Sequence, residues 1–210
     1  MIRILLIRHG KTDLLGRVLY GRMPDIHLNS EGQIEARMLA RELNARYEIS
    51  EVVSSPLDRA IETAQPIADF QGLGIVTDEG INELDFGSWM GKSFAELAQS
   101  DDWNQYNRLR ATSNPPGGES MTDVQGRAWR TLQRIAERYR DAEEATVAVV
   151  THGDVVRALL LLLLGMSIDH IHRLEVAPAS MSEVLLDGGE PVVRSVNQMS
   201  KNEPTPAQGE

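Results

Sequence analysis

The stretch RILLIRHGKT, residues 3–12, ends a run of aliphatic side chains on a histidine and a glycine, and VAVVTHGDVV, residues 147–156, does the same. An aliphatic run of this length, bounded by a turn, is typical of a β-strand that is buried on both faces. Such strands form parallel sheets that are covered by helices. Because parallel strands end at the same edge of a sheet, the two His-Gly pairs meet there if their strands are neighbours.

Further patterns place the rest of the chain around this sheet. Aliphatic runs predict buried strands over residues 2–7, 51–54, 74–77 and 146–151. Residues 182–186 and 191–196 flank Asp187-Gly188-Gly189-Glu190 and predict a hairpin at the sheet edge. Residues 120–140 predict a helix whose apolar face packs on the sheet; this face consists of Met121, Val124, Ala128, Leu132, Ile135 and Tyr139.

Helix starts and one irregular segment complete this outline. Ser30 with Gln33 and Ser93 with Glu96 predict capping boxes, and Ser55-Pro56 predicts a capped helix start. Residues 87–118 interrupt the regular alternation of strands and helices. We expect them to form an excursion over the carboxyl edge of the sheet, where open α/β sheets bind ligands.

Composition limits the class of protein. The chain has 210 residues, of which 41% are hydrophobic, and we expect one domain over residues 1–200 and a disordered tail over residues 201–210. The net charge of −10 argues against general attraction to nucleic acid or to an anionic membrane. The absence of cysteine and of a secretory leader favours the cytoplasm. Residues 155–166, interrupted by Arg157, predict a buried helix, because a membrane span needs a longer apolar run.

The two strand ends carry the candidate chemistry. His9 and His152 are each followed by a glycine, which permits a sharp turn and the close approach of a ligand to the backbone. A helix that begins near Asp154 offers free N–H groups to an anion. A histidine at a strand end is more often structural than catalytic, but two in the same setting favour a shared pocket.

A cation and an acid accompany the histidines. Arg59 follows a predicted strand and opposes the helix dipole, which favours an anion held in common; the alternative is a surface ion pair with Glu62. With Arg8, Arg59 can grip one phosphoryl group by bidentate hydrogen bonds. Glu83, in INELDFGSWMG, is the candidate acid, and Asp85 is its rival.

These residues resemble the histidine phosphatase superfamily, which includes cofactor-dependent phosphoglycerate mutases and many small-molecule phosphatases. The resemblance rests on LLIRHGKT, SSPLDRAIETA, ELDFGSWMG, GGES and VVTHGDVVRALL in this order. It implies a three-layer α/β/α sandwich with a mostly parallel sheet and an antiparallel edge. It also implies that His9 is the nucleophile that becomes phosphohistidine, that Glu83 donates and accepts the proton, and that Gly21 approaches the substrate. Arg8, Arg59 and His152 would bind phosphoryl oxygens, and we expect Gly153 to contribute to substrate binding.

The physical chemistry of the residues agrees with these roles. His9 must be neutral to attack phosphorus, and the positive charges of Arg8 and Arg59 disfavour its protonated form. Glu83 must be protonated in one half-reaction and ionised in the next, so an elevated pKa suits it. The arginines supply positive charge, and we therefore expect neither a metal ion nor another cofactor.

The sequence departs from the family pattern after the first histidine. Lys11 replaces the usual Glu or Gln, and Leu15 stands where an Asn often contacts phosphate. Lys11 either adds charge near the pocket or points to solvent. Thr12 either donates to the phosphate or caps the turn, and we favour the cap slightly.

Three rival functions remain open. Mutases similar to this chain carry a longer insertion with paired arginines and a lysine, whereas here Lys92, Arg108 and Arg110 are spread over residues 87–118, so we favour hydrolysis of a small phosphomonoester. A binding or regulatory protein would not need a protonatable Glu83. A metallohydrolase would use His9, His152, Asp154 and Glu83 as ligands. The residues identify neither the monoester nor an oligomeric state.

Overall fold

Six strands form one sheet in a computed structural model that describes residues 1–186 and 189–200. The strands are β1 (Ile2–Arg8), β2 (Glu51–Ser54), β3 (Ile75–Thr77), β4 (Ala145–Thr151), β5 (Met181–Leu186) and β6 (Val192–Gln198). Their order across the sheet is β3-β2-β4-β1-β5-β6. The β1–β4, β2–β4 and β2–β3 pairs are parallel, and β5 and β6 pair antiparallel. The expected mostly parallel sheet with an antiparallel edge is confirmed.

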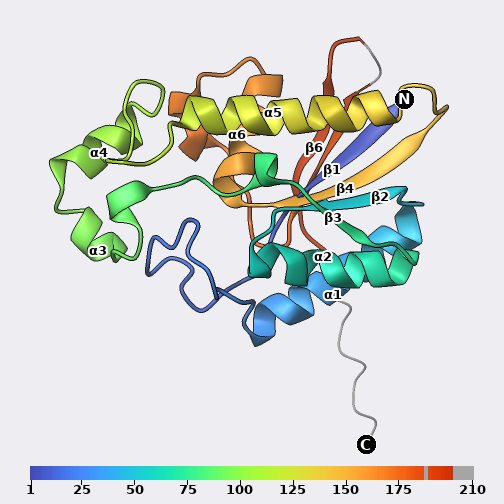
Figure 1. Cartoon of the computed structure of the whole chain (residues 1–210), viewed down its shortest axis with the longest axis horizontal. Helices are drawn as coiled ribbons and strands as arrows, with labels where there is room; N and C mark the ends of the chain where they lie inside the picture. Colours follow the sequence, from blue (N-terminus) through green and yellow to red (C-terminus); the bar gives the residue numbers. More distant parts are fainter. Residues whose placement is uncertain (187–188, 201–210) are drawn as a thin grey trace, which may run out of the picture.

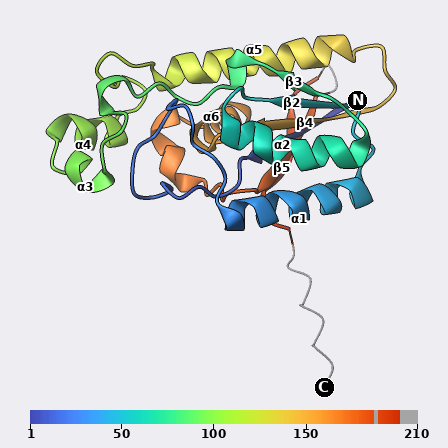
Figure 2. The same ribbon diagram turned by 60° about the horizontal axis from the view of Figure 1, so that its bottom comes forward.

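Helices cover both faces of the sheet. α1 (Ser30–Arg46) and α2 (Asp58–Gln71) lie on one face, and α5 (Met121–Arg138) lies on the other, as Figures 1 and 2 show. α6 (Gly153–Leu163) packs with α5 in the same apolar cluster. This is the expected three-layer α/β/α arrangement.

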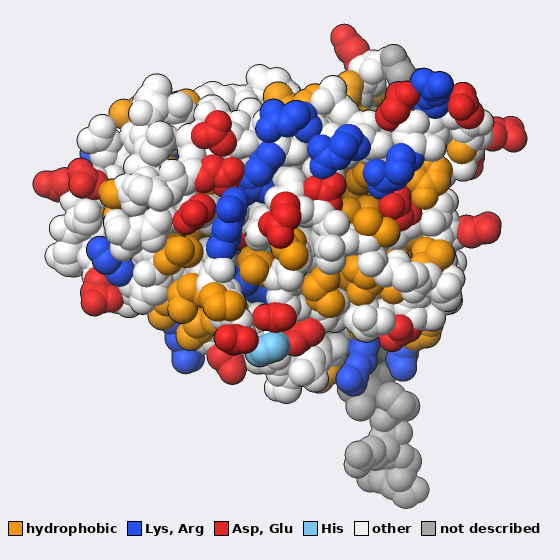
Figure 3. Space-filling view, viewed as in Figure 1, with side chains coloured by type: hydrophobic (Ala, Val, Ile, Leu, Met, Phe, Trp, Pro, Cys, Tyr) orange, Lys and Arg blue, Asp and Glu red, His pale blue; other side chains and the backbone are white. Residues whose placement is uncertain are grey.

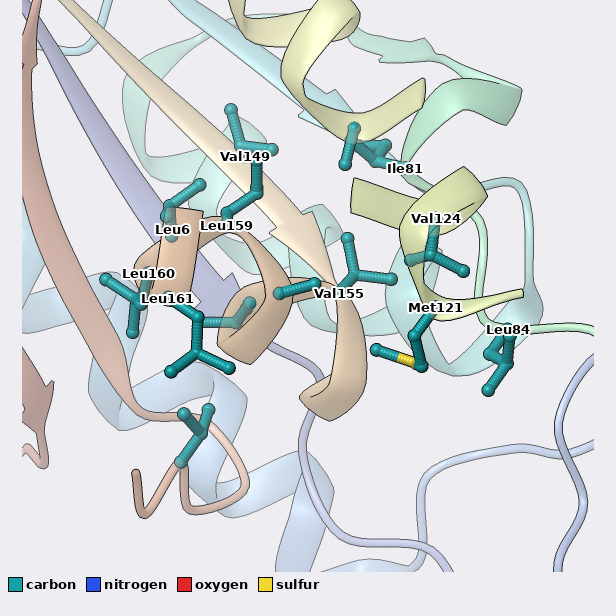
Figure 4. Packing of buried hydrophobic residues seen from close by; sticks show 14 of the residues in the cluster. Leu6, Ile81, Leu84, Met121, Val124, Val149, Val155, Leu159, Leu160 and Leu161 are labelled. Atoms are coloured by element: carbon teal, nitrogen blue, oxygen red, sulfur yellow. The ribbon is translucent and has the colours of Figure 1, made fainter. Parts of the chain in front are cut away.

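The side chains of β1 explain why its aliphatic run is continuous. Ile4 and Leu6 point into the cluster under α5 and α6, and Leu5 and Ile7 point into the cluster under α1 and α2. All four are fully buried, because both faces of the strand are covered. Figure 4 shows the first cluster, in which Leu6 and Val149 of the sheet lie near Leu159 of α6.

Two expectations about local structure are wrong. β3 is not buried on both faces: it is an edge strand, and Val76 is 48% exposed. α1 is capped by Asn29, whose side chain accepts from the Gly32 N–H, and Ser30 is the first helical residue.

The third predicted helix start is also wrong. α2 begins at Asp58 after Leu57, which makes no side-chain cap, so Pro56 lies outside the helix. The Ser55 hydroxyl is instead bonded to His152. By contrast, the capping box of Ser93 with Glu96 is present at the start of α3 (Phe94–Leu97).

The excursion leaves and rejoins the sheet region through one tight contact. It contains α3 and α4 (Asp101–Arg108), which lie beside the sandwich in Figure 1. Gly87 and Gly118 meet backbone to backbone, since a Cβ on Gly87 would lie 2.3 Å from the Pro116 carbonyl oxygen. The Glu119 N–H also donates to the Asp85 carbonyl at 2.9 Å. The ends of the excursion are therefore fixed beside Glu83.

The hairpin and the tail complete the comparison with the sequence. β5 and β6 pair as expected, but residues 187–188 of the predicted turn and the predicted tail 201–210 lie outside the described residues. The predicted helix over 120–140 is α5, with the Ser120 side chain accepting from the Asp123 N–H. Arginines of α5 pair with acidic side chains, and Lys and Arg lie interspersed with Asp and Glu on the face in Figure 3.

Candidate active site

The sheet register brings the two His-Gly pairs together. β1 and β4 are parallel neighbours with Arg8 opposite Thr151, and the His9 N–H donates to the Thr151 carbonyl at 2.9 Å. The rings of His9 and His152 follow directly, and their centroids lie 5.3 Å apart at an angle of 62°. Both side chains are buried. The two imidazoles therefore meet at the carboxyl edge of the sheet, as expected, although His9 and not His152 lines the cavity described below.

The hydrogen bond of His9 fixes which ring nitrogen is available. Its Nδ1 lies 2.7 Å from the Gly10 carbonyl oxygen. A carbonyl only accepts, so Nδ1 carries the proton and Nε2 keeps its lone pair in the neutral ring. Burial and the positive charges of Arg59 and Arg8 lower the pKa of His9 well below its ordinary value. His9 is thus a neutral base with a free Nε2 near pH 7.

Gly10 holds the His9 segment through contacts that only a small residue permits. A Cβ on Gly10 would lie 2.7 Å from the Gly32 carbonyl oxygen at the start of α1. The Gly10 N–H donates to the Thr63 hydroxyl of α2 at 3.0 Å. The glycine is therefore required by packing against α1, which the sequence did not indicate.

His152 is bonded through the opposite ring nitrogen. Its Nε2 lies 2.7 Å from the Ser55 hydroxyl, and its Nδ1 lies 4.0 Å from Glu83 Oε2. Burial, together with the charge of Arg59, lowers the pKa of His152 well below its ordinary value. Within residues 1–186 and 189–200, this buried Nδ1 has no hydrogen-bond partner.

Arg59 is completely buried, and the alternative ion pair with Glu62 is wrong. Its Nη2 donates to the Gly21 carbonyl at 2.6 Å, and its guanidinium lies 4.9 Å from the centre of the Tyr20 ring. Glu62 instead accepts from the Leu28 N–H and pairs with His27. In the described part of the chain, Nε and Nη1 of Arg59 have no partner.

Arg8 is the second guanidinium at this edge. Its Nη1 donates to the Val176 carbonyl at 2.7 Å, and its buried Nε lacks a partner among the residues that the structure describes. A Cβ on Gly153 would lie 3.2 Å from this Nε, so the glycine gives Arg8 room to lie against the start of α6. Buried N–H groups without partners are costly unless an anion or water binds them.

Glu83 lies between these cations and an acidic neighbour. Its side chain is 13% exposed, and its Oε1 accepts from the Leu84 N–H at 2.9 Å. Burial and the charge of Asp154 raise the pKa of Glu83 to about 7, although Arg59 and Arg8 oppose this rise. Such a carboxyl group exchanges a proton near neutral pH, as a general acid and base must.

The backbone of Glu83 is held by two further arginines. Arg22 and Arg127 both donate to the Glu83 carbonyl, at 2.7 and 3.0 Å. Glu119 pairs with both guanidiniums. The rival Asp85 is turned away: its Oδ1 accepts from the Gly87 N–H at 2.9 Å. Geometry therefore favours Glu83 over Asp85 as the acid.

A cavity of about 120 Å³ joins these groups. Its described lining includes Arg8, His9, Gly21, Glu83 and Gly153, all of them predicted from the sequence. Arg59 and His152 are buried and are not among the described lining residues. The charge of Arg59 lowers the pKa of His9, and the ring of His152 contacts that of His9. Further lining residues are Leu15, Gly16, Val18, Leu19, Tyr20, Phe86, Phe94, Asp154 and Arg157.

The two positions that depart from the family pattern have different surroundings. Lys11 forms ion pairs with Glu31 and Glu35 of α1 and does not line the cavity, whereas Leu15 does. Thr12 is buried, and in the described residues its hydroxyl makes no hydrogen bond, so the side-chain cap that we favoured is wrong.

Sequence reasoning missed the residues that support this site. Ser55 was predicted as a helix cap and instead orients His152. Arg110, from the excursion, forms a buried ion pair with Asp154 at 3.2 Å. Glu119 lies in the GGES motif, but nothing in that motif indicates its pairing with Arg22 and Arg127.

The described residues contain one group of side chains whose spacing suits a metal ion. Asp25, His27 and Asp58 offer ligand atoms within 4.8 Å of one another, and none of the three lines the cavity. Across residues 1–186 and 189–200, the set suggested for a metallohydrolase does not meet this spacing. The same residues include no helix that is long and apolar enough to cross a membrane.

The chain is similar to one protein family, to several curated proteins and to solved structures. The family described as "Histidine phosphatase superfamily (branch 1)" matches residues 4–199. The "Bifunctional protein Rv2228c" of Mycobacterium tuberculosis is 40% identical over 93% of this chain and 54% of its own length, so this chain spans about half of that relative. A 2,3-bisphosphoglycerate-dependent phosphoglycerate mutase of Mesorhizobium japonicum is 31% identical, over 82% of this chain and 86% of the relative. The native structure of the mycobacterial glucosyl-3-phosphoglycerate phosphatase Rv2419c superimposes with a TM-score of 0.82 and 26% identity, over 93% of this chain and 98% of that one.

Proposed function

The chain belongs to the histidine phosphatase superfamily, and we propose that it hydrolyses a small phosphomonoester through a phosphohistidine on His9. One observation carries the proposal. Buried polar atoms of Arg8, Thr12, Arg59 and His152 have no partner within the described residues. The ring of His152 contacts that of His9, and the charges of Arg59 and Arg8 act on His9. A phosphoryl group satisfies such donors and places phosphorus beside the nucleophile.

In the first half-reaction, Nε2 of His9 attacks phosphorus as the P–O bond to the alcohol breaks. Glu83 gives its proton to the departing alkoxide. The pKa of about 7 keeps a substantial fraction of Glu83 protonated at neutral pH. Arg8 and Arg59 bind the phosphoryl oxygens and balance their charge in the transition state.

In the second half-reaction, Glu83 is ionised and accepts a proton from water. The water oxygen attacks phosphorus, the P–N bond to His9 breaks, and inorganic phosphate leaves. Nε2 of His152 shares a hydrogen bond with the Ser55 hydroxyl, and in the tautomer that carries its proton on Nδ1 this second nitrogen donates to a phosphoryl oxygen. Neither half-reaction requires a metal ion or an organic cofactor.

The position of the excursion's cations supports hydrolysis over mutase activity. Arg110 is committed to Asp154, and Lys92 and Arg108 are exposed on the described surface. None of the three lines the cavity, where a mutase must hold a carboxylated substrate through both transfers. Water is therefore the favoured acceptor, despite the 31% identity with the mutase relative.

Turnover with a monoester labelled at phosphorus tests the proposal. We expect release of inorganic phosphate and a transient label on His9 that is stable in base and labile in acid. Activity no higher than that of His9→Ala would instead favour a binding protein. Formation of 2-phosphoglycerate from 3-phosphoglycerate and 2,3-bisphosphoglycerate, without free phosphate, would favour a mutase.

A further inference from the structure

Part of the cavity lining is apolar. Leu15, Val18, Leu19, Phe86 and Phe94 line it, and we call this set the apolar wall. Leu15 and Phe94 are partly exposed, whereas Leu19 and Phe86 are buried. His9 lines the same small cavity, so an alcohol attached to a phosphoryl group at His9 lies within reach of these side chains.

Backbone contacts fix the apolar wall before any ligand binds. The Leu19 N–H donates to the Lys92 carbonyl at 2.9 Å, and the Phe94 N–H donates to the Arg17 carbonyl at 3.1 Å. Val18 and Ser93 form an isolated antiparallel bridge. The loop that carries Leu15 and the excursion therefore present one continuous preformed surface.

The charged groups beside this surface disfavour a carboxylate. Arg157 lines the cavity, but its Nη1 pairs with Asp154 at 3.2 Å and its Nε donates to the Leu174 carbonyl at 3.0 Å. Asp154 and Glu83 both line the same cavity. A carboxylate on the alcohol would lose water against apolar side chains and approach the charge of Asp154, while Arg8, the other cation in the lining, binds the phosphoryl group in the proposed reaction.

We propose that this site selects phosphomonoesters whose alcohol portion is uncharged and apolar, and that it discriminates against carboxylated esters such as 3-phosphoglycerate and phosphoserine. The inference rests on the proposed phosphatase function. This selectivity would distinguish the chain from the phosphatase and the mutase described above, because the names of both include the word phosphoglycerate.

Two esters that differ by one group test the selection. Benzyl phosphate and 4-carboxybenzyl phosphate have alkoxide leaving groups of similar basicity, so their kcat/KM ratio reports recognition and not intrinsic reactivity. We expect benzyl phosphate to be preferred by about tenfold or more, the scale on which one apolar group matters in a pocket. Phosphoserine and 3-phosphoglycerate are expected to be poorer than benzyl phosphate. A ratio of one or less, or preference for phosphoserine, would overturn the inference.

The variant Leu15→Lys tests whether the apolar wall causes the preference for uncharged esters. A cation at this position is expected to lower the benzyl to 4-carboxybenzyl ratio by about tenfold. Leu164→Lys is the matched control: Leu164 is 44% exposed and follows the last turn of α6, far from the first turn that lines the cavity. An unchanged ratio in Leu15→Lys, or an equal change in both variants, would overturn the assignment.

Phe94→Ala provides a second variant whose readout does not depend on charge. We expect the ratio of kcat/KM for benzyl phosphate to that for glycerol-1-phosphate to fall by about tenfold. Phe70→Ala, at a residue of α2 that is 47% exposed, is the control. Equal losses for both esters would contradict the inference. Failure to hydrolyse any of the esters would contradict the proposed phosphatase function instead.

Discussion

His9 and His152 occupy the same sequence setting, a buried parallel strand that ends in His-Gly, yet their rings are held in opposite ways. His9 is bonded through Nδ1 to its own chain at Gly10, and His152 through Nε2 to Ser55. Within the described residues, the ring nitrogen left without a hydrogen bond is therefore Nε2 in His9 and Nδ1 in His152. The hydrogen-bond partner, and not the strand-end motif, determines what each ring can do.

The glycines that follow the two histidines also occupy the same sequence position but make different contacts. Gly10 packs against the backbone of Gly32 in α1, whereas Gly153 lies beside the Arg8 guanidinium. The first contact fixes the position of a ring, and the second leaves room for a cation. In the proposed reaction, one repeated motif thus supplies a nucleophile in one copy and part of an anion site in the other.

His9→Ala has the largest expected effect on this comparison. Losing the attacking nitrogen removes the covalent pathway, and we expect turnover to fall by about 10⁶-fold, as for loss of a nucleophile elsewhere. The measurement is phosphate release together with acid-labile label on the protein. Labelled His9→Ala protein would contradict the role assigned to His9.

Glu83→Gln tests the proposed acid, which lines the same cavity as His9. Gln cannot exchange a proton, so we expect kcat to fall by about 10² to 10⁴-fold, and most with the poorest leaving groups. In the unaltered protein kcat/KM should fall as pH rises above about 7, because Glu83 loses the proton it must donate, and this decline should be absent in Glu83→Gln. Asp85→Asn is the control, since Asn keeps an acceptor for the Gly87 N–H. If Asp85→Asn were the crippled variant, the assignment of the acid would be wrong.

His152→Ala separates binding from attack. Removing one donor to the phosphoryl oxygens should slow turnover by about 10² to 10³-fold. Label should still appear on His9, more slowly, because Nε2 of His9 is intact. Circular dichroism melts of both histidine variants report whether the fold survives. Label that persists in His9→Ala and vanishes in His152→Ala would reverse the two roles.

The sequence predicts the ends of these strands better than the contacts around them. A buried strand is visible as an aliphatic run, so the approach of His9 to His152 follows from sheet geometry alone. The hydrogen-bond partner of Arg59 does not follow from sheet geometry. It is the carbonyl of Gly21, which lies on a loop with no strand or helix pattern. Backbone acceptors have no residue signature, and contacts of this kind appear only in the folded chain.

The choice between Glu83 and Asp85 has a similar cause. Glu83 and Asp85 are two residues apart and both carry a carboxyl group, so residue type alone does not show which of them is the acid. The Gly87 N–H donates a hydrogen bond to the Asp85 side chain, whereas Arg22 and Arg127 donate hydrogen bonds to the backbone carbonyl of Glu83. These bonds come from segments far away in the chain, so local sequence favours Glu83 only through the family resemblance.

Substitutions of Lys11 and Asp154, the residues that follow the two His-Gly pairs, have the smallest expected effect on activity. Asp154 lines the cavity, and its negative charge helps to raise the pKa of Glu83, whereas Lys11 pairs with Glu31 and Glu35 outside it. Burial opposes ionisation of Asp154, but Arg110 and Arg157 outweigh burial and lower its pKa, so Asp154 stays charged at neutral pH.

Asp154→Asn therefore removes a charge that favours protonated Glu83. We expect the alkaline decline of kcat/KM to move to lower pH, with a change below about tenfold at pH 6, where the altered Glu83 still keeps part of its proton. Lys11→Gln is the matched control, because it also changes one unit of charge two residues after a catalytic-site histidine, and its profile should coincide with that of the unaltered protein. A shift toward higher pH in Asp154→Asn would contradict the effect assigned to its charge on Glu83, and shifts of equal size and opposite direction in the two variants would mean that net charge alone, and not the position of Asp154 in the cavity, controls the acid.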